Sequence, residues 1–153
     1  MDATDTLLEK FIREWAVSHE PSRFEIVTKP ETKGCPMSFH IHPANPNSAA
    51  ALLWVGDDDT SVSFAVGGDL WWDGGIPLEL APVHNLLEIV ALGQIQKQVR
   101  KLFGRVVALR GVVGTPKTNH YEYGQLNFFS IVPWLKWETI SYQPYFLAHN
   151  NDA

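Results

Sequence analysis

The segment over 82–103 constrains the fold most, because no other long stretch of the chain is free of interior prolines and turn clusters. Pro82 suits the first turn of a helix, and Gly104 can take the left-handed conformation that ends one. The pattern predicts one central helix of about six turns over 82–103. Before Gly93 the apolar residues cover the whole circumference, so we expect this half to be buried on all sides. After Gly93 a single apolar stripe remains, formed by Ile95, Val99 and Leu102, and this half should emerge from the core.

Shorter patterns predict the elements on either side of this helix. Thr6 followed by Glu9 matches a capping box, and apolar residues then recur at helical spacing until near His19. Alternating or apolar runs between turn clusters predict strands, of which the run over 49–55 should be buried on both faces. The expected strands cover 24–28, 37–42, 49–55, 61–66 and a short 76–80 before the central helix, and 105–113, 120–132 and 136–142 after it.

These elements predict the fold class. The short connections between strands favour antiparallel pairing, and a curled sheet would bury the apolar half of the central helix. We therefore expect an α+β fold: an N-terminal helix and a curved, mainly antiparallel sheet of about seven strands packed around one long central helix. A chain of 153 residues suits a single domain over 1–153, with a loosely ordered tail from about residue 147.

The composition excludes several classes of protein. Cys35 is the only cysteine, which excludes a disulfide framework and a cysteine-based zinc site. The first residues are acidic and polar, unlike a signal peptide, and no apolar run reaches the roughly 18 residues of a membrane span. We therefore expect a cytoplasmic protein that does not bind membranes. The net charge of −5, without aromatic and basic residues interleaved, disfavours nucleic-acid binding.

Charge is distributed unevenly along the chain. The segment over 34–96 contains seven acidic residues and no Lys or Arg, whereas the segment over 97–153 contains seven Lys or Arg and three acids. An acidic segment of this kind can mark a surface for a basic partner. The simpler interpretation is internal neutralisation, in which bases such as Arg105, Arg110 or Lys136 face the acids across the fold.

A glycine-bracketed segment over 67–75 contains the strongest candidates for partner binding, Asp69, Trp71, Trp72 and Asp73. Neighbouring residues of an extended chain point to opposite sides, so one tryptophan can be buried while the other is exposed. An exposed tryptophan beside two carboxylates is typical of an interface hot spot in this predicted loop. The alternative is that both rings fill the core, since large aromatic side chains are buried on average.

Four polar residues form a second candidate site, a pocket between the sheet and the central helix. His40 and His42 share one face of an expected strand, and His84 and Glu88 share one face of the central helix. A zinc centre needs a third protein ligand, which the sequence does not place near the histidines, so we expect no metal. The same residues can also be explained without a pocket. His40 and His42 would then be exposed strand residues, and His84 and Glu88 would lie in a solvated first helical turn or Glu88 would pair with an arginine from a neighbouring strand.

No catalytic or phosphate-binding motif is present, and we expect no cofactor. The first hypothesis is a non-enzymatic protein-binding module that acts on a basic protein. The comparison is with small acidic inhibitors of the immunity-protein type, and it is an analogy of charge and size only. The alternative is a small-molecule-binding protein or enzyme that uses the polar pocket. The third is a protein that dimerises through an edge strand, and either a monomer or a homodimer is compatible with the sequence.

Overall fold

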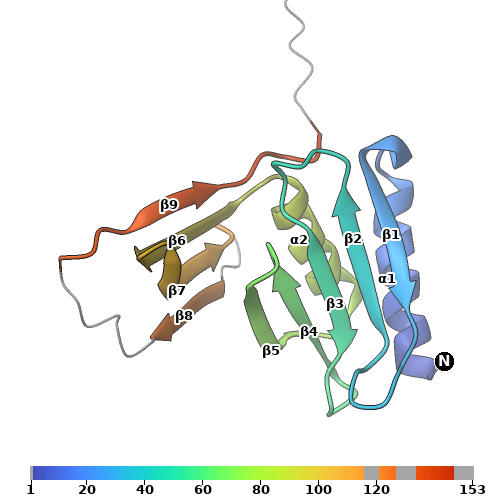
Figure 1. Cartoon of the computed structure of the whole chain (residues 1–153). Coiled ribbons are helices and arrows are strands. Elements are labelled where there is room, and N and C mark those ends of the chain that lie inside the picture. The colour runs from blue at the N-terminus through green and yellow to red at the C-terminus, as the bar shows by residue number, and fades with distance from the viewer. Residues whose placement is uncertain (1, 116–120, 127–133, 147–153) are drawn as a thin grey trace, which may run out of the picture.

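The computed structural model describes residues 2–115, 121–126 and 134–146, which form an α+β fold. Within these residues, two α-helices and a short 3₁₀ helix accompany two antiparallel sheets (Figure 1). The elements in chain order are α1 (Ala3–Val17), η1 (Pro21–Arg23), β1 (Phe24–Lys29), β2 (Ser38–Pro43), β3 (Ala51–Val55), β4 (Ser61–Val66), β5 (Leu70–Pro77), α2 (Leu80–Ala91), β6 (Ile95–Leu102), β7 (Arg105–Val113), β8 (Tyr121–Leu126) and β9 (Glu138–Ser141).

The prediction of one long central helix over 82–103 is wrong. The helix α2 ends at Ala91, and the chain continues as strand β6. Gly93 causes the change, because it has a φ of +69° and its backbone N–H donates to the carbonyl of Val90 at 3.0 Å. A glycine in this left-handed conformation terminates a helix. The stripe that predicted a helix has a second explanation: Ile95 and Val99 also lie on one face of a strand, since they are an even number of residues apart.

The prediction of a single sheet of about seven strands is also wrong. Among the described residues, one sheet has five strands in the order β1-β2-β3-β4-β5, and the other has four in the order β8-β7-β6-β9. Strand β6 pairs with β7 and β9 rather than with β5. The sheets meet through side chains instead: a Cβ at Gly111 of β7 would lie 2.7 Å from Leu70 of β5. The absence of a side chain at Gly111 therefore allows this close approach.

Other expected elements are confirmed, with shifted boundaries. The first helix is present, but its N-cap is Asp2, whose carboxylate accepts a hydrogen bond from the N–H of Thr4 at 3.0 Å. Strands β1, β4 and β7 lie where the alternation predicts them, and β3 and β4 form the expected hairpin. The segment over 67–75, expected to be a loop, instead contributes to β5. Residues 120 and 127–132 of the expected long strand and the tail from 147 lie outside the described residues.

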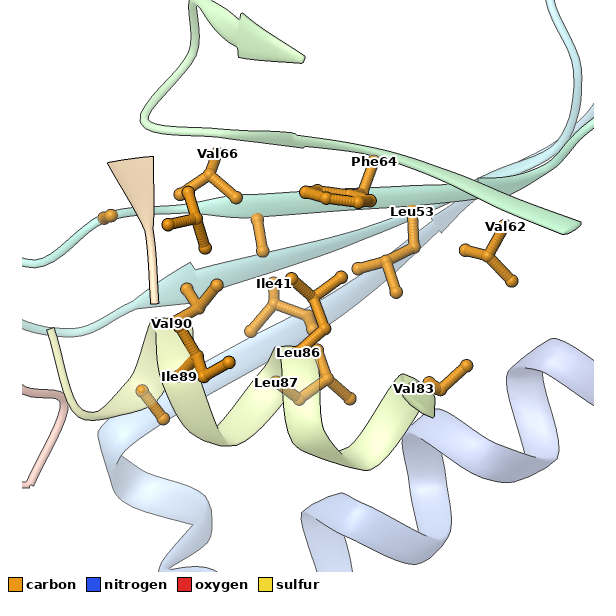
Figure 2. Packing of buried hydrophobic residues seen from close by; sticks show 14 of the residues in the cluster. Ile41, Leu53, Val62, Phe64, Val66, Val83, Leu86, Leu87, Ile89 and Val90 are labelled. Carbon is orange, nitrogen blue, oxygen red and sulfur yellow. The ribbon is translucent and has the colours of Figure 1, made fainter. Parts of the chain in front are cut away.

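The core forms between α2 and the five-stranded sheet. Figure 2 shows Leu86, Leu87 and Val90 of α2 facing Ile41 and Phe64 of the sheet. The buried cluster also includes residues from the second sheet. The apolar residues of this helical half are buried up to Ala91, but burial on all sides is not observed, because Asn85 is exposed, the Glu88 side chain is 44% exposed and Leu92 is 52% exposed. Helix α1 covers the rest of the same sheet face, and its buried residues are Leu8, Ile12 and Trp15.

Candidate binding pocket on the open sheet face

The five-stranded sheet has one covered face and one open face. The helices lie on one side of it in Figure 1, and the side chains of Phe39, Ile41 and Leu53 on that side are buried. Side chains alternate along a strand, so the residues between them face the opposite side. Residues that are opposite one another on neighbouring strands form a row across all five strands on this open face, consisting of Val27, His40, Leu52, Ala65 and Trp71.

The connection between β1 and β2 encloses a pocket at one part of the open face. The pocket has a volume of about 640 Å³. Leu52 and Trp54 of β3 contribute apolar surface, and Pro30 and Pro36 contribute more from the connection. The remaining lining residues are Lys29, Thr32, Cys35, Ser38 and His40. The result is a mainly apolar cavity with a few polar groups, which is the usual composition of a small-molecule site.

His40 is the polar group that faces this pocket from the sheet. Its Nε2 lies 3.1 Å from the hydroxyl of Ser38, and its ring stacks on that of His42 with centroids 5.8 Å apart. Burial lowers the pKa of His40 below its ordinary value, and the charges of Lys29 and His42 lower it further. The imidazole is therefore neutral at neutral pH, so it can offer a hydrogen bond to a ligand without placing a charge in the apolar pocket.

The described lining contains a serine beside a histidine. A serine next to a histidine is the beginning of a nucleophilic site, but such a site needs a third group that orients the imidazole. None of the described residues that line the pocket is acidic, and the neighbour that stacks on His40 is another histidine. Cys35 is exposed at the pocket wall.

The four residues of the predicted polar pocket do not come together. His84 is hydrogen-bonded through Nε2 to the carbonyl of Phe11 at 2.8 Å. The carboxylate of Glu88 accepts hydrogen bonds from Trp15 and is paired with His19. Both residues thus join α2 to α1, on the covered side of the sheet, whereas His40 and His42 lie on the open side. The partners of Glu88 are residues of α1 and the turn after it, rather than an arginine from a strand.

The candidate partner-binding residues divide between internal contacts and the surface. Asp69 forms a salt bridge with Lys97, at 3.0 Å, and Asp73 accepts a hydrogen bond from the hydroxyl of Ser63 at 3.2 Å. Trp72 stacks on a core phenylalanine, whereas Trp71 is 51% exposed on the open face. The two rings thus divide as the alternation of a strand predicts, although the acids beside them already have partners within the protein.

The sequence did not point to most of the pocket. Leu52 and Trp54 were expected to be buried on both faces of a central strand, but β3 alternates between buried and partly exposed residues. The pocket also depends on the connection that contains Cys35, whose path over the sheet no local pattern predicts. The alternation of the strand over 37–42 was the one available signal, since it already placed His40 on a polar face.

Comparisons with family models, curated proteins and solved structures find no match to this chain. Across the residues that the structure describes, no three His, Cys, Asp or Glu side chains gather closely enough to hold a metal ion. The described helices are too short or too polar for any of them to span a membrane.

Proposed function

We propose that the protein is a non-enzymatic binding module that holds a small, largely apolar ligand in the pocket on the open sheet face. The observation that carries this proposal is the combination of volume and lining. Ligand sites typically enclose about 300–1,000 Å³ and place a few polar groups in an apolar wall. The pocket here encloses about 640 Å³ and has Leu52, Trp54 and two prolines in its wall.

Each part of the lining has a role in the proposed site. Leu52 and Trp54 contact the apolar body of the ligand, whose transfer from water supplies most of the binding free energy. His40 and Ser38, which lie 3.1 Å apart, provide one polar contact for a hydroxyl or carbonyl group. A cationic ligand is disfavoured, because the wall is mainly apolar and the one charged side chain among the lining residues is Lys29.

The test is a fluorescence titration with N-phenyl-1-naphthylamine, a neutral probe that emits strongly in apolar sites. We expect saturable binding to the wild type and at least about tenfold weaker binding to Leu52→Lys, because the new ammonium enters the pocket. Trp71→Ala is the matched control: Trp71 is on the same face but does not line the pocket, so binding should persist. Equal probe affinity in the wild type and Leu52→Lys would contradict the proposal, as would no saturable binding at all.

A second candidate function, binding of a basic protein, is favoured by one specific observation, the 51% exposure of Trp71. Asp73 is exposed on the same strand, and the turn between β3 and β4 adds the exposed Asp57 and Asp59. Capture experiments with wild type, Trp71→Ala and Leu52→Lys separate the two functions. A protein that is retained by Leu52→Lys, lost with Trp71→Ala and released by salt would support this second candidate, because salt screens charge attraction.

A further inference from the structure

The free edge of β1 has a charge pattern that is complementary to itself. We propose that β1 pairs antiparallel with β1 of a second copy, around a two-fold axis at Val27. The five-stranded sheets of two protomers would then form one continuous sheet. This interface follows the outer edge of β1 and shares only Lys29 with the pocket, and the proposal does not depend on the function of the pocket.

The backbone of β1 leaves one edge without a partner. Strand β1 is the first in the order β1-β2-β3-β4-β5, and within the described residues no strand pairs with its other side. The N–H of Ala44 donates to the carbonyl of Arg23 at 2.9 Å, which sets the alternation of the strand. Residues 25, 27 and 29 therefore direct their backbone groups toward β2.

The same alternation directs the N–H and C=O groups of Phe24, Ile26 and Thr28 away from the sheet. A row of unpaired backbone groups on an edge strand is a template for another strand. With the axis at Val27, Ile26 of one copy lies opposite Thr28 of the other. Both residues have their backbone groups on the free edge, so they can exchange reciprocal hydrogen bonds.

The charges select this register. An axis at Val27 places Glu25 opposite Lys29 of the second copy, and the symmetry repeats this pair. An axis at Glu25 would oppose two carboxylates, and axes at Ile26 or Thr28 would place Val27 opposite one of the charges. Opposite charges across a strand pair are stabilising, and like charges are destabilising.

The side chains needed for these pairs are available. Glu25 and Lys29 are exposed, and neither takes part in a salt bridge among the described residues. A lysine on an edge strand usually discourages pairing with another chain. In the proposed register each lysine would lie opposite a glutamate of the second copy. The lysine would therefore not discourage pairing of the two strands in this register. The paired Val27 side chains would also continue the row of residues on the open face from one copy into the other.

Sedimentation equilibrium of the full chain tests the interface. We expect the wild type to approach twice the monomer mass of 17.2 kDa as its concentration rises. Glu25→Lys and Lys29→Glu should each weaken dimerisation by at least about tenfold, and the double swap Glu25→Lys/Lys29→Glu should restore it. Glu31→Lys, just outside the strand, is the matched control and should leave dimerisation unchanged. A monomeric wild type, or a double variant that does not recover, would overturn the proposal.

Disulfide trapping tests the axis itself. In a Cys35→Ser background, Val27→Cys places two cysteines opposite each other in a non-hydrogen-bonded pair, where Cα atoms are about 4.5 Å apart. This separation is within the range that disulfides accept. We expect a covalent dimer on mild oxidation. Lys29→Cys in the same background should form no covalent dimer, because its neighbour in the second copy would be Glu25. Equal crosslinking of the two variants would exclude an axis at Val27.

Discussion

The ammonium of Lys97, in β6, lies 3.0 Å and 3.1 Å from the two carboxylate oxygens of Asp69, just before β5. Lys97 is 8% exposed, and its ammonium also lies 5.7 Å from the centre of the Tyr142 ring. The pair connects the two sheets, which do not share a strand. It also shows that part of the acidic segment is neutralised internally, although by Lys97 rather than by Arg105, Arg110 or Lys136, which the sequence suggested.

The environment of Lys97 determines when this pair stabilises the fold. Burial alone would lower the pKa of Lys97, but hydrogen bonding to Tyr142 and Asp69 outweighs it, and the pKa is raised above 10.5. A raised lysine pKa means that the folded state holds its proton more tightly than the unfolded state. The contribution is therefore complete below pH 10.5 and is lost as the pH rises through the folded pKa.

Asp69→Asn is expected to lower the free energy of unfolding by about 1–3 kcal/mol at neutral pH, because it leaves the Lys97 ammonium without its carboxylate. Asp69 is 47% exposed, so solvent keeps the effect below that of a fully buried pair. Urea unfolding measures the change. Asp57→Asn is the control: Asp57 is exposed and forms no ion pair among the described residues, so the variant should stay within about 0.5 kcal/mol of the wild type. Equal losses in the two variants would contradict this role for Asp69.

Gly93→Ala tests why the central helix ends where it does. Alanine in the left-handed conformation costs about 1–2 kcal/mol, and at Gly93 its Cβ would also lie 2.7 Å from the carbonyl oxygen of Tyr142. Gly104→Ala is the matched control, since Gly104 also has a positive φ but no atom within 4 Å of the added Cβ. Thermal or urea unfolding should show a clearly larger loss for Gly93→Ala. Similar losses would mean that contact with the backbone at Tyr142 is unimportant.

The sequence predicted a helix or strand correctly where the spacing of its apolar residues fits only one of the two structures. Strand β4 has Val62, Phe64 and Val66 at every second position of its sequence, and it lies where that pattern predicts it. Strand β6 does not: its apolar residues Ile95 and Val99 fit a helix as well as a strand, and the buried residue between them is Lys97. A lysine at a core position makes sense only with Asp69 facing it, and that contact is not visible along the chain.

The candidate site was less predictable than the fold, because distant segments assemble it. The strand pattern placed His40 on a polar face, but the pocket wall also comes from β3 and from the connection after β1. His84 and Glu88 were the more obvious polar residues, since they interrupt an apolar helix. Their partners Trp15 and Phe11 belong to α1, which lies far from them in the sequence. Contacts of this kind arise from tertiary packing rather than from local pattern.

Leu87→Ala is expected to lower the free energy of unfolding by about 2–5 kcal/mol, the usual range for a buried leucine that leaves a cavity. Leu87 lies within the cluster between α2 and the sheet in Figure 2. Leu92→Ala is the control, because Leu92 caps the C-terminal end of α2 and its side chain is half exposed. This variant should lower the free energy of unfolding by no more than about 0.5 kcal/mol. Chemical denaturation with both variants decides whether α2 is the centre of the core. A loss below about half a kcal/mol at Leu87 would show that it is not.

Titration of His40 should make both the stability of the protein and the ligand affinity of the pocket depend on pH. Burial, Lys29 and His42 lower the pKa of His40 below 6.5 in the folded protein. Between the folded pKa and 6.5 the unfolded chain therefore binds more protons, and stability falls as the pH falls through that window. His40→Gln removes this titration, so it should lose less stability than the wild type when the pH is lowered.

The measurement is the change in the free energy of unfolding between about pH 7.5 and about pH 5.5, taken for each protein by urea titration. His42→Gln removes one of the causes of the shift but keeps the buried imidazole, so its pH dependence should lie between those of the wild type and His40→Gln. A neutral ligand in the pocket desolvates His40 further, so the affinity for N-phenyl-1-naphthylamine should fall as the pH drops through the pKa of His40 in the ligand-free folded protein. If the wild type and His40→Gln respond equally to pH in both measurements, His40 does not titrate in contact with the pocket.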